Sequence, residues 1–389
     1  MRKPVMFAGH RARAQKLMVL FHRPCVLLKR WSVGVFLAPQ LLFAQALKPL
    51  PLSWENATFE GYQCVQATAR GEVYLFRSDR WAVQAVAENG ELGEASPLHL
   101  TSPAQEPRFA ALSPDGEAWL VLAGEPRLFL RGQEVSLAPL PFIPVSAAFL
   151  GDTPIVQVSP GVFVGENAGK ALEKWRQKPP WLLAWEGGEW QPWAFAPKAP
   201  HSAGDEMEDA LQLNNVLLAS AGKSLVVAWR YAHRYWLLNS QGQPELSLER
   251  RSFKLPRRSG EEAEAELREA MKKEGVATEN MTIVHASRLT SACLGLATRR
   301  DGTVFAVMGK PVTGGGLVLE RFDPKAPVVH AVRLDLPYDG RLSLACGKKG
   351  LYLAAHSAQK GRWFLPWEML EKAAWAEVDV EVKGKPHQQ

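Results

Sequence analysis

The fold is decided by residues 109–137, FAALSPDGEAWLVLAGEPRLFLRGQEVSL. Short apolar segments alternate in this stretch with turns at Asp115-Gly116, Gly124-Glu125-Pro126 and Gly132-Gln133. Gly and Asp suit hairpin turns because these turns need a positive φ, which Gly adopts freely and Asp tolerates. The stretch therefore predicts four antiparallel strands, at residues 109–112, 117–122, 127–130 and 134–137.

The same pattern, a turn glycine followed by an apolar strand, occurs six times along the chain. The turn glycines are Gly71, Gly116, Gly161, Gly222, Gly302 and Gly350, and the intervals between them are 45, 45, 61, 80 and 48 residues. A period of roughly 40 to 50 residues made of strands and turns is typical of a β-propeller. The sequence thus predicts an all-β fold, a six-bladed β-propeller of four-stranded antiparallel blades.

The two long intervals require insertions, at about 196–209 and 250–285. The second one contains a predicted short helix near 259–275, which begins with Ser259 and Glu262 at capping-box spacing. Glu264 and Arg268 form a favourable i,i+4 pair on this helix, as do Glu269 and Lys273. A basic run precedes the helix, and a solvated loop is favoured over a partner site there.

The N-terminal segment resembles an export signal. Residues 1–46 contain eight Lys or Arg residues and no Asp or Glu, and they end in an uncharged run, 31–44, followed by Ala44-Gln45-Ala46. This arrangement predicts a secretory signal peptide over 1–46, cleaved at about Ala46, and a single propeller domain over 47–389. An uncleaved N-terminal membrane anchor is the alternative. The sequence does not decide whether translation starts at Met1 or at Met18.

Removal of this segment changes the charge balance. The whole chain carries 46 basic and 40 acidic residues, a net charge of +6, whereas 47–389 carries 38 against 40, a net charge of −2. The basicity therefore belongs to the signal, and nucleic acid is excluded as a partner. No transmembrane segment is expected in the mature chain, which is predicted to be periplasmic or secreted.

Three cysteines remain in the mature chain. Cys64 and Cys346 lie on the expected first strands of the first and last units, which are neighbours in a closed ring. Buried free thiols are favoured for them and for Cys293, with a disulfide between Cys64 and Cys346 as the alternative.

No standard catalytic or metal-binding motif is present. The chain lacks H-E-x-x-H, C-x-x-C and G-x-S-x-G. Gly222-Lys223-Ser224 has no upstream glycine and lies between two strands, so it is a blade turn rather than a phosphate loop. No catalytic residue and no cofactor is therefore predicted.

Two groups of aromatic residues are candidates for contacts with a ligand. In the first, Trp181 and Trp185 alternate with Leu183 along a strand, so packing between blades is favoured. The second is an expected loop tip between two strands, a predicted surface for a ligand or partner that comprises Arg230, Tyr231, His233, Arg234 and Tyr235. Packing of the loop is the alternative for this second group.

The repeat units resemble the six-bladed, TolB-like propeller superfamily. Its units often carry an Asp-Gly turn before an apolar strand, and Asp115-Gly116 and Asp301-Gly302 match best, each with the strand that follows. Residues 250–256, followed by a charged helix, resemble an insertion of exported bacterial members. The resemblance covers most of 53–382 and implies the fold, whereas it says little about function, because the superfamily holds binding scaffolds and several enzyme types.

Two hypotheses for the function follow. The favoured one is an exported, non-enzymatic binding scaffold in the periplasm or cell envelope whose partner is a protein, a peptide or an envelope polymer. The alternative rests on the family resemblance alone: a metal-dependent hydrolase or lactonase of the gluconolactonase-like kind, with a divalent cation in the central channel. The acidic and Asn residues that bind this cation in such enzymes are not identified in this sequence.

Overall fold

The computed structural model describes residues 46–52, 54, 61–140, 142–163, 180–195, 215–250, 291–309, 316–338, 340–357 and 360–384, and five residues between 261 and 269. The chain divides into Met1–Leu42 and Phe43–Gln389, and all of these residues belong to the second unit. The predicted signal peptide, the insertion at about 196–209 and most of the insertion at 250–285 lie outside the described residues.

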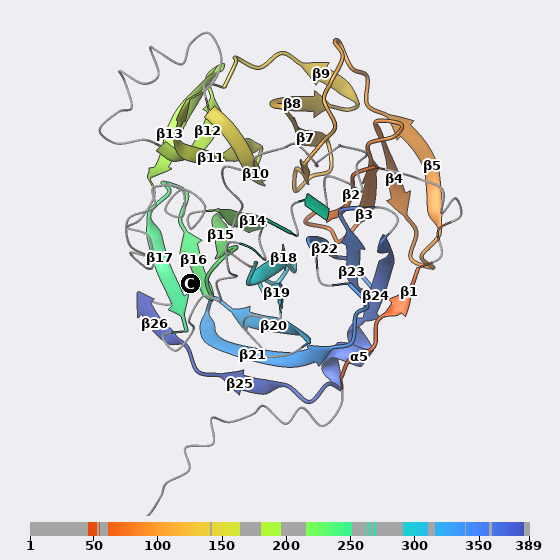
Figure 1. Ribbon diagram of the computed structural model, residues 1–389, viewed down its shortest axis with the longest axis vertical. Helices are drawn as coiled ribbons and strands as arrows, with labels where there is room; N and C mark the ends of the chain where they lie inside the picture. The colour runs from red at the N-terminus through yellow and green to blue at the C-terminus, as the bar shows by residue number, and fades with distance from the viewer. Residues whose placement is uncertain are drawn as a thin grey trace, which may run out of the picture. The chain divides into compact units, whose positions relative to one another are not determined.

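Six antiparallel sheets, numbered here as blades 1 to 6 in chain order, make up the described fold (Figure 1). Blades 1 to 3 each consist of four consecutive strands: β2 (Gln63–Ala67), β3 (Val73–Arg77), β4 (Ala82–Val86) and β5 (Leu92–Pro97); β6 (Phe109–Leu112), β7 (Ala118–Ala123), β8 (Glu125–Leu130) and β9 (Gln133–Val135); β10 (Phe142–Leu150), β11 (Thr153–Phe163), β12 (Pro180–Glu186) and β13 (Glu189–Phe195).

Blades 4 to 6 include strands from the two ends of the chain. Their consecutive strands are β14 (Val216–Ala221), β15 (Ser224–Trp229), β16 (Arg234–Leu238) and β17 (Pro244–Glu249); β18 (Cys293–Thr298), β19 (Val304–Met308), β20 (Leu317–Asp323) and β21 (Ala326–Leu334); β22 (Leu342–Cys346), β23 (Gly350–Ala355) and β24 (Arg362–Pro366). The added strands are β26 (Glu381–Gly384) in blade 4, β25 (Ala376–Val378) in blade 5 and β1 (Leu50–Pro51) in blade 6.

The six blades form a closed ring. The first strand of each blade contacts the first strand of the next, through β2, β6, β10, β14, β18 and β22, and β22 in turn contacts β2 (Figure 1). These inner strands surround the centre of the ring. The predicted six-bladed propeller of four-stranded blades is confirmed.

The two ends of the chain complete the outer edges of the later blades. Leu50 pairs with Phe364 and Pro51 with Trp363, so β1 supplies the fourth strand of blade 6. Strand β25 pairs with β21, and β26 pairs with β17, each as a fifth strand. An exposed sheet edge presents unpaired backbone groups, and these short strands satisfy them.

Most of the predicted turns lie where the sequence places them. Gly71, Gly116, Gly222 and Gly302 each have a positive φ in the turn between the first two strands of a blade. The prediction for the third unit is wrong, because Gly161 lies inside β11 and the turn is at Gly151, with a φ of +59°. Strands β10 and β11 are long and shifted in register, so Pro160-Gly161 falls within the sheet instead of ending it.

The helical content differs slightly from the prediction. In the insertion, the described residues Glu261, Glu264, Ala265, Arg268 and Glu269 are helical. Arg268 contacts Glu264 at 2.8 Å, which confirms one of the two predicted i,i+4 pairs. A further short helix, α5 (Trp367–Glu371), follows β24 and was not predicted.

The hydrophobic core lies between the blades. Each of six clusters of buried apolar residues combines side chains from two neighbouring blades. Trp181 of blade 3 and Trp229 of blade 4 are fully buried, and their ring centres lie 5.4 Å apart. The interpretation of Trp181 as packing between blades is therefore confirmed.

Candidate functional site

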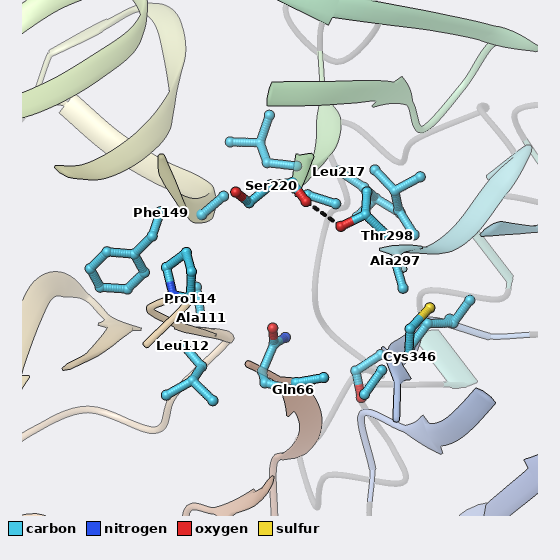
Figure 2. A pocket seen from close by; sticks show the side chains of 18 of the residues that line it. Gln66, Ala111, Leu112, Pro114, Phe149, Leu217, Ser220, Ala297, Thr298 and Cys346 are labelled. Carbon is cyan, nitrogen blue, oxygen red and sulfur yellow. Dashed lines mark hydrogen bonds between the residues drawn. The ribbon is translucent and has the colours of Figure 1, made fainter. Parts of the chain in front are cut away.

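A cavity of about 290 Å³ lies inside the ring (Figure 2). All six inner strands line it, and one representative from each, in chain order, is Gln66, Ala111, Phe149, Leu217, Ala297 and Cys346. Its volume is near the lower end of the range for ligand pockets, which begins at roughly 300 Å³. The centre of the ring can therefore hold a small ligand or a short segment of a larger one.

Several polar side chains near the cavity bind the neighbouring inner strand. Thr298 of β18 donates a hydrogen bond to the carbonyl oxygen of Ser220 in β14 (Figure 2). The Gln66 amide donates to the carbonyl oxygen of Ala110 at 3.2 Å, and the Ser343 hydroxyl accepts from the backbone of Val65 at 2.9 Å. These bonds hold the inner strands in place around the cavity.

The five residues predicted as a ligand surface lie together at the junction of β15 and β16. Arg230, Tyr231, His233 and Tyr235 are all buried, and Arg230 is only 3 % exposed. The expectation of an exposed loop tip is thus wrong, while their role toward a ligand stays a prediction. The reason is the packing of blade 5, since the backbone N–H groups of Ala292 and Cys293 donate to the Arg230 carbonyl oxygen at 2.6 and 3.1 Å.

The fifth member of this group, Arg234, is partly buried and has a structural role. Its guanidinium donates to Glu249 at 2.9 Å across the β16–β17 pair. It also lies over the rings of Trp229 and Trp236, 5.2 and 5.5 Å from their centres.

A buried carboxylate connects two members of the group to blade 5. Glu320 on β20 is 1 % exposed, accepts a hydrogen bond from the Tyr235 hydroxyl at 2.6 Å, and lies 2.8 Å from His233 Nε2. Burial, followed by the charge of Glu320, raises the pKa of Tyr235 well above its usual value. Glu320 was not predicted from the sequence, although a carboxylate directly after the apolar residues Leu317, Val318 and Leu319 of a strand is a signal that could have identified it.

Residues of blades 1 and 6 lie at the same end of the ring as this group. Arg230 and His356 each directly follow the second strand of a blade, and Tyr62 and Arg341 each directly precede a first strand. The first two strands of a blade are antiparallel, so the start of the first strand and the end of the second lie at the same end of the ring. The backbone N–H of His356 donates to the Arg341 carbonyl oxygen at 3.2 Å, and the Tyr62 and His356 rings lie 5.1 Å apart. Tyr62 and His356 also line the cavity, which therefore reaches this end of the ring.

Positive charges accumulate at this end. Burial, followed by the charge of Arg341, lowers the pKa of Arg230 to about 10. Burial, followed by the charges of Arg341 and Arg230, lowers the pKa of His356 to about 3. Within the described part of the chain, no carboxylate pairs with Arg230 or Arg341.

The three cysteines of 47–389 are free and buried. Ser343 contacts Val65, next to Cys64, whereas Cys346 lies three residues further along β22, so the two thiols occupy different levels of the ring. Burial raises the pKa of Cys64 and Cys293 to about 12. The favoured interpretation as buried free thiols is confirmed.

Among the residues that the structure describes, no three His, Cys, Asp or Glu side chains are grouped as metal ligands would be. No helix in the same part of the chain is long and apolar enough to cross a membrane.

Comparisons with known proteins give similarity to solved structures alone. No family model and no curated protein matches the chain. A streptogramin B lyase structure matches with 10 % identity and a TM-score of 0.42, over 87 % of each chain. A Kuenenia stuttgartiensis hydrazine synthase matches with 13 % identity and a TM-score of 0.38, over 75 % of this chain and 73 % of that one. Similarity at this level carries no information about activity.

Proposed function

We propose that this propeller is a non-enzymatic binding scaffold, exported to the periplasm or cell envelope. Its channel receives part of a protein, a peptide or an envelope polymer. The observation that carries the proposal is the cavity of about 290 Å³ bounded by the inner strands of all six blades. The same proposal includes export, which the signal-like residues 1–46 support. It also includes membership of the TolB-like superfamily, which the Asp-Gly turns of the repeats support.

The groups around the channel support binding rather than chemistry. Gln66, Thr298 and Ser343 already hydrogen-bond to the neighbouring inner strand, so they contribute to the wall. The channel offers a ligand its shape and a lining of mixed polarity, in which Leu217 and Ala297 are among the apolar side chains. Burial of apolar surface is the main favourable term in such association.

A channel-filling substitution tests where binding occurs. Gln66 projects into the cavity (Figure 2), so Gln66→Trp should occupy it, whereas Gln133→Trp places the same side chain on the exposed outermost strand of blade 2. Ligands captured from the cell envelope by the full chain would be identified, and their affinity measured by calorimetry. Gln66→Trp should weaken binding at least about ten-fold, which is about 1.4 kcal/mol, and Gln133→Trp should leave it unchanged. Equal affinity for both variants would contradict binding in the channel.

Two further measurements test the remaining parts of the proposal. A panel of esters and lactones, assayed with and without added divalent cations, should give no turnover. Turnover that Gln66→Trp abolishes would refute the scaffold and support the hydrolase alternative. Cell fractionation with N-terminal sequencing should place the chain outside the cytoplasm and begin it near Leu47. Retention in the cytoplasm would refute export.

A further inference from the structure

A buried arginine lies at one end of the channel. Arg230 is 3 % exposed, and within the described residues its guanidinium interacts with the Tyr231 side chain but with no carboxylate. Burial of an uncompensated charge costs several kcal/mol, and buried charges in proteins are normally paired. The fold keeps Arg230 buried despite this cost. A negative charge from outside the described chain would therefore stabilise its guanidinium.

The guanidinium of Arg341 and the imidazole of His356, which its pKa of about 3 leaves uncharged at neutral pH, share this position. Arg341 is exposed and interacts electrostatically with Arg230 and with His356, and its carbonyl oxygen is 3.2 Å from the His356 backbone nitrogen. Blades 4 and 6 are not neighbours in the ring, so these charges act across the end of the channel. Like charges held together destabilise each other, and an anion bound between them adds attractive interactions that offset this repulsion.

We propose that Arg230, Arg341 and His356 form a binding site for an oxyanion, a carboxylate or phosphate, at this end of the channel. The ligand carries a short apolar part that enters the cavity. The guanidinium group favours such anions because its planar array of N–H donors matches two of their oxygens. The cavity reaches the site through Tyr62 and His356, and the apolar side chains in its mixed lining, such as Leu217 and Ala297, suit an uncharged tail. This inference rests on the proposed function, because it names the chemical group that the scaffold recognises.

Calorimetry on the full chain tests the site with defined probes. Hexanoate supplies a carboxylate with an apolar tail, 1-hexanol supplies the tail alone, and inorganic phosphate supplies an oxyanion alone. Hexanoate should bind at least about ten-fold more tightly than 1-hexanol, a difference of about 1.4 kcal/mol. Equal binding of hexanoate and 1-hexanol would overturn the oxyanion site. Phosphate binding as tight as that of hexanoate would overturn the role of the tail.

Two arginine variants locate the site. Arg341→Met removes an exposed charge at the proposed end, so the fold should tolerate it, as a thermal melt would verify. Arg70→Met removes an exposed charge in the turn between β2 and β3, at the opposite end of the ring and outside the cavity lining. Arg341→Met should weaken hexanoate binding at least about ten-fold, while Arg70→Met leaves it unchanged. An equal effect of both variants, or none from Arg341→Met, would overturn the site.

The outcomes separate this inference from the proposed function. If Gln66→Trp abolishes capture of the cellular ligand but Arg341→Met does not, the scaffold stands and the oxyanion site is refuted. If the full chain captures no cellular ligand, or captures one whose binding Gln66→Trp does not weaken, the binding-scaffold proposal is refuted whether or not hexanoate binds.

Discussion

Replacing Tyr235 by Phe removes one hydroxyl group from the interface between blades 4 and 5. This hydroxyl donates to Glu320 at 2.6 Å and lies 3.1 Å from the sulfur of Met308. Tyr235 and Glu320 are 2 % and 1 % exposed, so water cannot replace the lost donor easily. A hydrogen bond to a charged group contributes about 1.5 to 3 kcal/mol. Because His233 still contacts both carboxylate oxygens, at 2.8 and 2.9 Å, we expect a loss near the lower end, about 2 kcal/mol.

Urea denaturation followed by tryptophan fluorescence measures this loss, with an unchanged dependence on urea as evidence that the folded state is intact. Tyr352→Phe is the matched control. Tyr352 is 3 % exposed and its ring packs 4.7 Å from that of Phe364, but its hydroxyl makes no hydrogen bond to the described residues. The control should change the free energy of unfolding by less than about 0.5 kcal/mol. Equal losses in the two variants would refute the role assigned to Glu320.

Three other predictions concern a thiol, a turn and a titration. Cys64, buried with a pKa of about 12, should not react with a thiol reagent at pH 8 until the protein is unfolded, and prompt labelling of the native protein would contradict its burial. Gly242→Ala should destabilise the fold by at least about 2 kcal/mol in urea denaturation, because φ is +72° and the new methyl group would overlap the carbonyl oxygen of Trp193. Gly222 has a similar φ of +64° but open space around it, so Gly222→Ala should destabilise the fold by only about 1 kcal/mol. His356 has a folded pKa of about 3 against the usual 6.5, so the unfolded chain binds more protons between these values and stability falls as pH decreases below 6.5. Between pH 7 and 4.5 the chain should lose up to about 2.7 kcal/mol relative to a His356→Asn variant, and parallel pH profiles for the two would contradict the low pKa.

Local chemistry explains how much of the fold the sequence predicts. The first strand of blade 2 was expected at 109–112 and is observed at Phe109–Leu112, because each of its boundaries carries a clear turn signal. Strands β1, β25 and β26 have two to four residues and no turn signal, and they form because distant blade edges need partners. Only the assembled ring creates those edges.

The candidate site was predicted in part. Arg230, His233 and Tyr235 can be grouped from the sequence because they are neighbouring polar and aromatic residues at the end of a strand. Glu320 cannot be placed with them in this way, because it lies 87 residues from His233 and meets it only when blades 4 and 5 pack together. The proximity of Arg341 and His356 to Arg230 cannot be predicted either, because it follows from closure of the ring. Burial, which changes the chemistry of all these groups, is a property of the tertiary structure.

The pairing of β1 with β24, which joins an early and a late segment of the chain in blade 6, has a consequence for biosynthesis. Leu50 and its partner Phe364 are separated by 314 residues (364 − 50), so nearly the whole described chain must be made before this pair can form. Contacts between such distant residues slow folding. Until then, the apolar cluster between blades 6 and 1, which includes Val65, Leu75 and Ala345, stays in contact with water. A nascent or truncated chain that lacks β24 therefore exposes a surface that favours aggregation, and chaperones should be needed at least until β24 has been made.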